Sequence, residues 1–245
     1  MQPNAEKQIV AKMLQAKINA MQGLGKSSGE PAKTELAPFD AAFPGNVFPT
    51  GAIHEFVSYE PTHAASTSGF ITALAGKFMK EGSLCLWIGT DRKIFPSGLK
   101  LFGIQPDRVV FIHISKQKDK LWIIEEALKC EALTVVVGEM TALGFTESRR
   151  LQLAVERSGV IGFIHRFQPR IENAVASTSR WKIIPLESTI PDGLPGVGHS
   201  RWDVQLLKVK NGKPNSWQIS WIDGKFIQTD GQHISVPSLH ERHAG

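Results

Sequence analysis

The chain has 245 residues, of which 42% are hydrophobic and 21% are charged. This length and these shares of hydrophobic and charged residues allow one large buried core and exclude a disordered chain. No apolar run reaches the roughly 18 residues that a membrane span needs, and residues 1–6 lack the basic and then apolar start of a secretory signal. We therefore expect a cytoplasmic protein. The net charge of +5 permits weak contact with nucleic acid, although a solvated surface is the favoured reading of so small an excess.

The first segment has the pattern of an amphipathic helix followed by a linker. Apolar side chains recur at spacings of three and four between residues 6 and 22, so they form one stripe on a helix: Ile9, Val10, Met13, Leu14, Ile18 and Met21. Gly, Ser, Pro and Lys then dominate, as is typical of a linker. We divide the chain into a helix at 1–25, a linker at 26–47, a core domain at 48–225 and a flexible tail at 226–245.

The core domain alternates strand and helix patterns. Short apolar runs predict strands at 52–57, 84–88, 109–114, 133–137 and 160–167. Amphipathic spacing predicts helices at 68–80, 119–130 and 146–157, the last with Thr146 as its N-cap. This rhythm indicates an α/β fold with a mostly parallel sheet flanked by helices. After residue 168 the pattern changes to strands at 180–186, 201–209 and 217–222, which we expect to be antiparallel strands at the sheet edge.

A phosphate-binding loop is missing where this architecture would hold one. The segment 58–68 lies between the first strand and the next helix, and no Lys or Arg occurs between Phe56 and Gly76. A phosphate loop needs a lysine, and Glu60 would repel a triphosphate. Residues 25–27 read Gly-Lys-Ser, but Ala20 stands where that motif needs its first glycine. We therefore interpret residues 25–27 as linker.

Candidate metal and acid/base groups are few. A carboxylate that holds a metal would be expected at the end of the strand 133–137, but this position is Gly138. The neighbouring Glu139 is expected to point to the opposite face of the sheet from residue 138, because side chains alternate along a strand. His54, Glu55 and His63 flank the segment 58–68 without a second ligand cluster, so structural hydrogen bonding is the favoured reading. We expect buried thiols in a reducing compartment for Cys85 and Cys130, which lack metal-ligand spacing.

The order of several short motifs resembles the core of the RecA recombinase and, more closely, the ImuA family of RecA-like and SulA-like accessory proteins. Each motif is short, and their order along the chain is the specific part. They are Phe-Pro-Thr-Gly-Ala-Ile-His-Glu at 48–55, Leu-Trp-Ile at 86–88, Glu-Glu-Ala-Leu at 125–128, Ser-Arg-Arg-Leu-Gln-Leu-Ala at 148–154, Arg180-Trp181 and Arg201-Trp202.

The resemblance implies a RecA-like fold and a non-catalytic adaptor, without a cofactor, in the SOS-type DNA damage response and translesion synthesis. The implied partners are a Y-family polymerase homologue of the ImuB kind, an error-prone replicative-type DNA polymerase, and RecA. Two alternatives stay open. One is a divergent RecA-like ATPase that uses Glu139, and the other is a SulA-like inhibitor of cell division.

Two groups of residues are candidates for partner binding. The resemblance to RecA, whose N-terminal element packs on the neighbouring subunit in filaments, implies that the N-terminal stripe docks on RecA or on a second copy of this chain. The second group pairs cations with tryptophans, which are residues that anchor interfaces or stack on nucleic-acid bases but also fill cores. These candidates are Ile9, Met13, Leu14, Ile18, Met21, Arg180, Trp181, Arg201 and Trp202.

Overall fold

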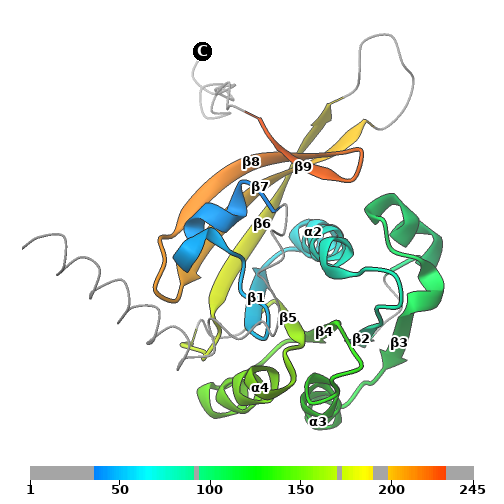
Figure 1. Ribbon diagram of the computed structural model, residues 1–245, viewed down its shortest axis with the longest axis vertical. Helices are drawn as coiled ribbons and strands as arrows, with labels where there is room; N and C mark the ends of the chain where they lie inside the picture. The colour runs from blue at the N-terminus through cyan, green and yellow to red at the C-terminus, as the bar shows by residue number, and fades with distance from the viewer. Residues whose placement is uncertain (1–35, 91–93, 170–172, 190–197, 230–245) are drawn as a thin grey trace, which may run out of the picture.

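The computed structural model describes residues 36–90, 94–169, 173–189 and 198–229. Within these residues, nine strands form one sheet in the order β3-β2-β4-β5-β1-β6-β7-β8-β9. Helices cover both faces of the parallel part (Figure 1). The predicted class, an α/β fold with a mostly parallel sheet and antiparallel C-terminal strands, is confirmed.

The parallel part of the sheet runs from β3 to β1, and β1 is in the middle of the nine described strands, between β5 and β6. Its strands are β1 (Ile53–Ser58), β2 (Cys85–Gly89), β3 (Val109–His113), β4 (Val135–Met140) and β5 (Ile161–Phe167). All six residues of β1 are buried. A strand covered on both faces needs no alternation of polar and apolar residues, which explains the nearly continuous apolar runs in the sequence.

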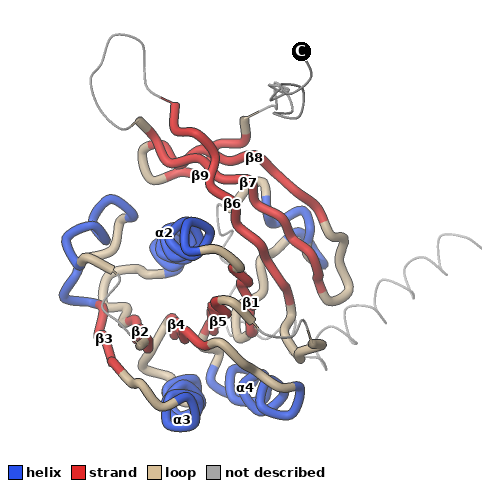
Figure 2. Tube along the Cα trace, turned by 180° about the vertical axis from the view of Figure 1, so that it is seen from behind, coloured by secondary structure: helices blue, strands red, loops and turns tan. Residues whose placement is uncertain are grey.

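Two hydrophobic cores lie on opposite faces of this sheet. The helix α2 (Pro61–Phe78) covers one face, while α3 (Gln117–Leu128) and α4 (Phe145–Ser158) cover the other, as Figure 2 shows from behind. Four short 3₁₀ helices complete the described chain: η1 (Phe39–Ala42), η2 (Pro44–Asn46), η3 (Pro96–Phe102) and η4 (Pro106–Arg108). The core on the α2 side includes Phe70 and Leu99, and the core on the other side includes Ile124 and Leu151.

The C-terminal strands extend the sheet beyond β1. They are β6 (Ser179–Thr189), β7 (His199–Val209), β8 (Asn215–Ile222) and β9 (Lys225–Gln228). β6 runs parallel to β1, and β7, β8 and β9 follow as an antiparallel meander. No strand was expected at β9. Its Phe226 is buried, so the sheet continues past residue 225, where we expected a flexible tail.

An aromatic cluster fastens the chain before β1 to the C-terminal strands. Phe39 makes edge contacts with the rings of Phe70, Trp181 and Trp217, with centroids 5.5, 5.8 and 5.2 Å apart. Leu36 and Phe43 are also buried. The expected linker is therefore corrected over residues 36–47, because isolated aromatic side chains anchor this Gly- and Pro-containing stretch to the core. Residues 26–35 lie outside the described residues.

Three local predictions are wrong. The helix expected from residue 68 begins at Pro61, whose fixed backbone angle suits the first turn. The helix expected from Thr146 begins at Phe145, with Gly144 as its N-cap residue and no side-chain cap. Cys130 is exposed at the end of α3, while Cys85 is buried as expected, and burial raises the pKa of the Cys85 thiol to about 12.

We expect Gly76→Ala to destabilise the fold where α2 packs against η3. A Cβ atom at Gly76 would lie 2.1 Å from the carbonyl oxygen of Phe102, so the backbone must move. Such overpacking costs about 1–3 kcal/mol, which exceeds the gain of roughly 1 kcal/mol that alanine brings to a helix interior. Urea unfolding measures the loss. Gly98→Ala is the matched control, because a Cβ atom there meets nothing within 4 Å, and equal stability of the two variants would contradict the packing account.

Candidate functional site

The connection from β1 to α2 consists of Tyr59 and Glu60 alone. Glu60 has an extended backbone and accepts the first helical hydrogen bond, from the amide of Ala64 at 3.0 Å. The segment 58–68, where we expected a loop without a phosphate-binding lysine, is therefore the end of a strand, a two-residue connection and the start of a helix. A phosphate loop cradles its ligand with several backbone amides of a glycine-rich loop, and two residues leave no room for one.

A hydrogen-bonded group of three side chains locks this connection. The Ser58 hydroxyl lies 2.8 Å from the Thr67 hydroxyl and 3.0 Å from Nε2 of His165. Ser58 and Thr67 are fully buried, and His165 is nearly so. The contacts join β1, α2 and β5. Because Ser58 is inaccessible, the pair of serine and histidine has a structural role rather than that of a nucleophile and its base.

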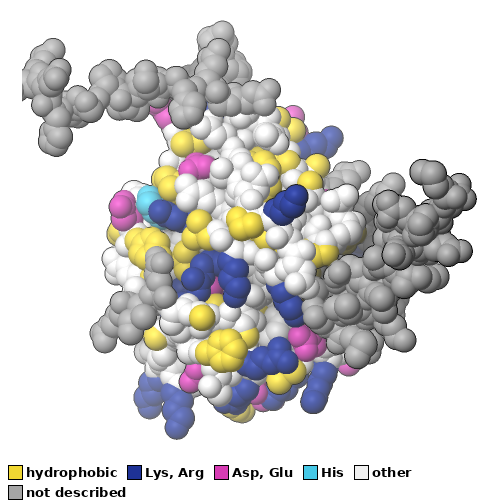
Figure 3. All heavy atoms as spheres, turned by 90° about the vertical axis from the view of Figure 1, so that its left-hand side faces the viewer, with side chains coloured by type: hydrophobic (Ala, Val, Ile, Leu, Met, Phe, Trp, Pro, Cys, Tyr) yellow, Lys and Arg dark blue, Asp and Glu magenta, His cyan; other side chains and the backbone are white. Residues whose placement is uncertain are grey.

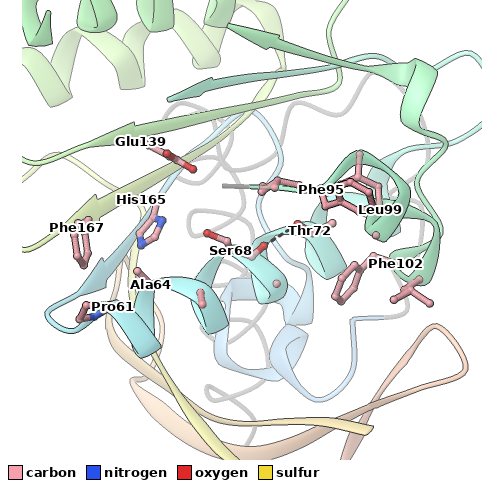
Figure 4. Close-up of a pocket in the computed structure, with 15 residues that line it drawn as sticks. Pro61, Ala64, Ser68, Thr72, Phe95, Leu99, Phe102, Glu139, His165 and Phe167 are labelled. Carbon is pink, nitrogen blue, oxygen red and sulfur yellow. Dashed lines mark hydrogen bonds between the residues drawn. The ribbon is translucent and has the colours of Figure 1, made fainter. Parts of the chain in front are cut away.

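A pocket of about 560 Å³ opens beside this group, between α2 and η3. Ala64, Ser68 and Thr72 of α2 form its floor, as Figure 4 shows. Glu139 and His165, from β4 and β5, lie on one side, and residues of η3 with the preceding loop lie on the other. Most of the lining is apolar. We call this cavity the α2–η3 pocket.

Glu139 faces the α2–η3 pocket, and its neighbour Gly138 faces the opposite core. Glu139 accepts a hydrogen bond from Nε1 of Trp87 at 2.9 Å. A Cβ atom at Gly138 would lie 2.5 Å from the Ile124 side chain of α3, so a metal-binding aspartate at this position does not fit. The two positions thus point to opposite faces, as we expected from the alternation of a strand. Within the described residues, no three His, Cys, Asp or Glu side chains are grouped to hold a metal.

Behind the pocket, on the α3 and α4 side, lies a buried ion triad made of Glu55, Arg166 and Arg180. Oε1 of Glu55 accepts from Arg166 at 2.8 Å, and Oε2 accepts from Arg180 at 2.6 Å. Both guanidinium groups also donate to Asn173, which ties the chain after β5 to the sheet. Burial and the nearby Arg180 charge lower the pKa of Lys208, whose ammonium group donates to a backbone carbonyl.

His54 is also a structural residue. Its Nε2 donates to the Pro49 carbonyl at 2.9 Å, and Nδ1 lies 2.7 Å from the Ser179 hydroxyl. Burial lowers the pKa of His54 to about 4, so the ring is neutral at physiological pH. Structural hydrogen bonding, the favoured reading for His54 and Glu55, is confirmed. His63, on the first turn of α2, lies 3.8 Å from Glu60.

The cation and tryptophan pairs do not form a surface platform. Adjacent residues of a strand point to opposite faces, so Arg180 meets Glu55 while Trp181 enters the aromatic cluster. Trp181 and Trp202 are buried, so of the alternatives left open for them the structure shows the one in which their indoles fill the core. Arg201 donates to the Glu187 carbonyl. Ile9, Met13, Leu14, Ile18 and Met21 lie outside the described residues.

Sequence reasoning missed the α2–η3 pocket and the His165 side chain. The residues that line the pocket come from separate segments between Pro61 and Phe167. Only the order of the strands in the sheet shows that these segments lie close together. The strand pattern at 160–167 did place His165 in an apolar run, and a polar residue inside a buried strand is a signal for a specific hydrogen-bond partner. None of the helices that the structure describes is long and apolar enough to cross a membrane.

The fold and site define an α/β protein with a central parallel sheet, no room for a phosphate loop after β1, and an apolar pocket in its place. No family model matches the chain. Two curated relatives, both named Protein ImuA, come from two different strains of Caulobacter vibrioides. Each is 32% identical to this chain over 203 residues. The match covers 78% of this chain and 81% of each relative. The chain belongs to the ImuA family.

We expect Glu55→Gln to be strongly destabilising. The substitution removes the charge that compensates the buried guanidinium group of Arg166 and the partly buried one of Arg180. Breaking a buried ion pair in this way costs about 3–5 kcal/mol. Glu126→Gln is the matched control, because Glu126 pairs with Lys129 with both side chains about half exposed. Exposed pairs contribute at most about 1 kcal/mol. Chemical unfolding of both variants gives the comparison, and similar losses would show that the triad does not hold β1, β5 and β6 together.

Proposed function

We propose that this protein is a non-catalytic adaptor in the mutagenic response to DNA damage, acting during translesion synthesis. Membership of the ImuA family supports the pathway. The observation that carries the adaptor role is the two-residue connection between β1 and α2. An ATPase of this architecture needs a loop and a lysine there to hold the phosphates of its substrate, and this chain has neither.

The remaining chemistry of the site supports the same proposal. Glu139 is the carboxylate closest in sequence to the expected metal position, but it lies on the α2 side of the sheet and accepts from Trp87. The pairing of Ser58 with His165 is buried. Without a phosphate loop or an accessible nucleophile at this site, we propose that the protein works through the surfaces it presents to other proteins.

The proposed partners are an ImuB-like Y-family polymerase homologue, an error-prone replicative-type DNA polymerase, and RecA. The N-terminal residues Ile9, Met13, Leu14, Ile18 and Met21 are the proposed contact to RecA or to a second copy, because one apolar stripe with two methionines is an adaptable docking surface. Arg201 is the proposed contact on the core. Arg180 is engaged by Glu55 and is a less suitable one.

Direct contact with DNA is proposed to be weak and sensitive to salt. From His165 to the C-terminus there are ten Lys and Arg against seven Asp and Glu, an excess of three. In Figure 3, Lys and Arg side chains stand in separate groups with hydrophobic, acidic and uncharged atoms between them. Binding by phosphate contacts requires a continuous basic surface and weakens steeply as salt rises.

Deleting residues 1–25 is expected to weaken association with RecA or with a second copy while leaving the melting temperature of the core nearly unchanged. The reason is that a linker is expected between that segment and the core, and Phe39 at the start of the described core packs on Phe70, Trp181 and Trp217. Size-exclusion chromatography with light scattering and a binding titration against purified RecA measure association, and calorimetry measures the melting temperature.

A matched pair of point variants sharpens this test. Leu14→Asp places a charge on the apolar stripe, whereas Gln15→Asp places the same charge off it. Loss of association in the first variant alone supports the proposal. A large fall in melting temperature on deletion, with association intact, would assign the segment to the core and reject it as a partner contact. A full chain that binds none of the proposed partners would contradict the adaptor role.

A further inference from the structure

We propose that this protein forms a two-fold symmetric dimer in which the edge strand β3 pairs antiparallel with β3 of a second copy. The pairing joins two nine-stranded sheets into one continuous sheet. The proposal depends neither on the adaptor role nor on the N-terminal stripe. It rests on the hydrogen-bonding direction of β3, on its uncharged sequence and on the side chains that the pairing brings together.

β3 is one of the two edge strands of the described sheet, as Figure 1 and Figure 2 show. On its inner side it pairs in parallel with β2, and the amide of Ile114 donates to the Gly89 carbonyl at 2.9 Å. Alternate residues of a strand direct their backbone groups to the same side, so residues 110 and 112 also bond to β2. The backbone groups of the intervening residues point away from β2: Val109, Phe111 and His113.

β3 lacks the features that normally keep an edge strand apart from other strands. Native edges carry lysine or proline, contain a bulge, or are very short. Residues 109–114 contain neither lysine nor proline, and the register of β3 with β2 is continuous. The opposite edge, β9, is shorter and begins with Lys225. Since an unprotected edge is a template for strand addition, β3 is the edge that we expect to be used.

The strand is complementary to itself when the two-fold axis passes through Phe111. This register pairs all five residues of β3, because Val109 then lies opposite His113 of the second copy and their outward backbone groups meet. It also sets Val110 opposite Ile112. Val110 is 53% exposed, because α3 packs on β2 and β4 rather than over β3. Pairs of β-branched residues and pairs of aromatic rings stabilise antiparallel strands, so a second copy is the occupant that these contacts favour.

Concentration and amide exchange test the pairing in the unmodified full chain. Five residue pairs make a small contact, so the dimer is weak and its population depends on concentration. Sedimentation should show the mass rising from 26.9 kDa toward twice that value between low and high micromolar concentration. Over the same range, exchange of the amides of Val109, Phe111 and His113 should slow by at least about tenfold, whereas the amides of Val110 and Ile112, already bonded to β2, should change less.

Two substitutions to lysine separate the two edges of the sheet. Val110→Lys adds a charge of the kind that protects edge strands and should weaken the dimer at least about tenfold. Ile227→Lys is the matched control, because Ile227 is similarly exposed but lies on β9. His113→Pro removes one outward N–H that the ladder to β2 does not use, and it should weaken the dimer even if Val110→Lys is unstable. A circular dichroism spectrum checks that each variant folds.

Leu14→Asp distinguishes this contact from the proposed N-terminal one, and the outward amides of β3 should stay protected in that variant. Three results would overturn the proposal: a monomer at every concentration, a dimer that both Val110→Lys and His113→Pro leave intact, or protection of β3 that Leu14→Asp removes. Loss of the dimer in Ile227→Lys alone would assign the contact to β9 and overturn it as well.

Discussion

The two-residue connection between Ser58 and Pro61 is the constraint on which the site depends. It forces α2 to begin directly above the end of β1, and the hydrogen bonds that join Ser58 with Thr67 and with His165 hold it there. The first turns of α2 then occupy the space that a phosphate loop would need, and their small side chains become one wall of the α2–η3 pocket. A single geometric feature thus places helix where a phosphate loop would lie and lines one wall of an apolar cavity.

Charge and aromatic packing attach the C-terminal strands to this frame from opposite faces of β1. On one face, Glu55 joins Arg166 and Arg180 and so connects β1 with β5 and β6. On the other, Trp181 of β6 stacks near Phe56 of β1, with ring centroids 6.2 Å apart. Because Arg180 and Trp181 both belong to β6, these contacts attach the antiparallel meander to the parallel part, and Trp221 of β8 can fix the position of η3.

The strands and the α/β class of the fold could be predicted, because a short apolar run such as 133–137 is typical of a buried strand. The start of α2 could not, since Thr62, Ser66 and Ser68 are small polar residues that favour loops as readily as first turns. Phe39 gave no periodic signal in a Gly- and Pro-containing stretch. The pocket depends on strands brought together by the sheet order, so no local pattern in the sequence could reveal it. The lack of a carboxylate at Gly138 and the lack of a lysine after β1 could be predicted from the sequence, because each concerns a single residue type with a defined chemical role.

Calorimetric titration of the purified full chain with Mg-ATP, with and without single-stranded DNA, tests the central claim most directly, followed by a phosphate-release assay on the same samples. The account predicts no saturable heat at millimolar nucleotide and no turnover above buffer, because the connection of Tyr59 and Glu60 offers no loop and no ammonium group. Saturable binding with turnover that is lost in Glu139→Gln would contradict it, and would identify the protein as a divergent ATPase instead.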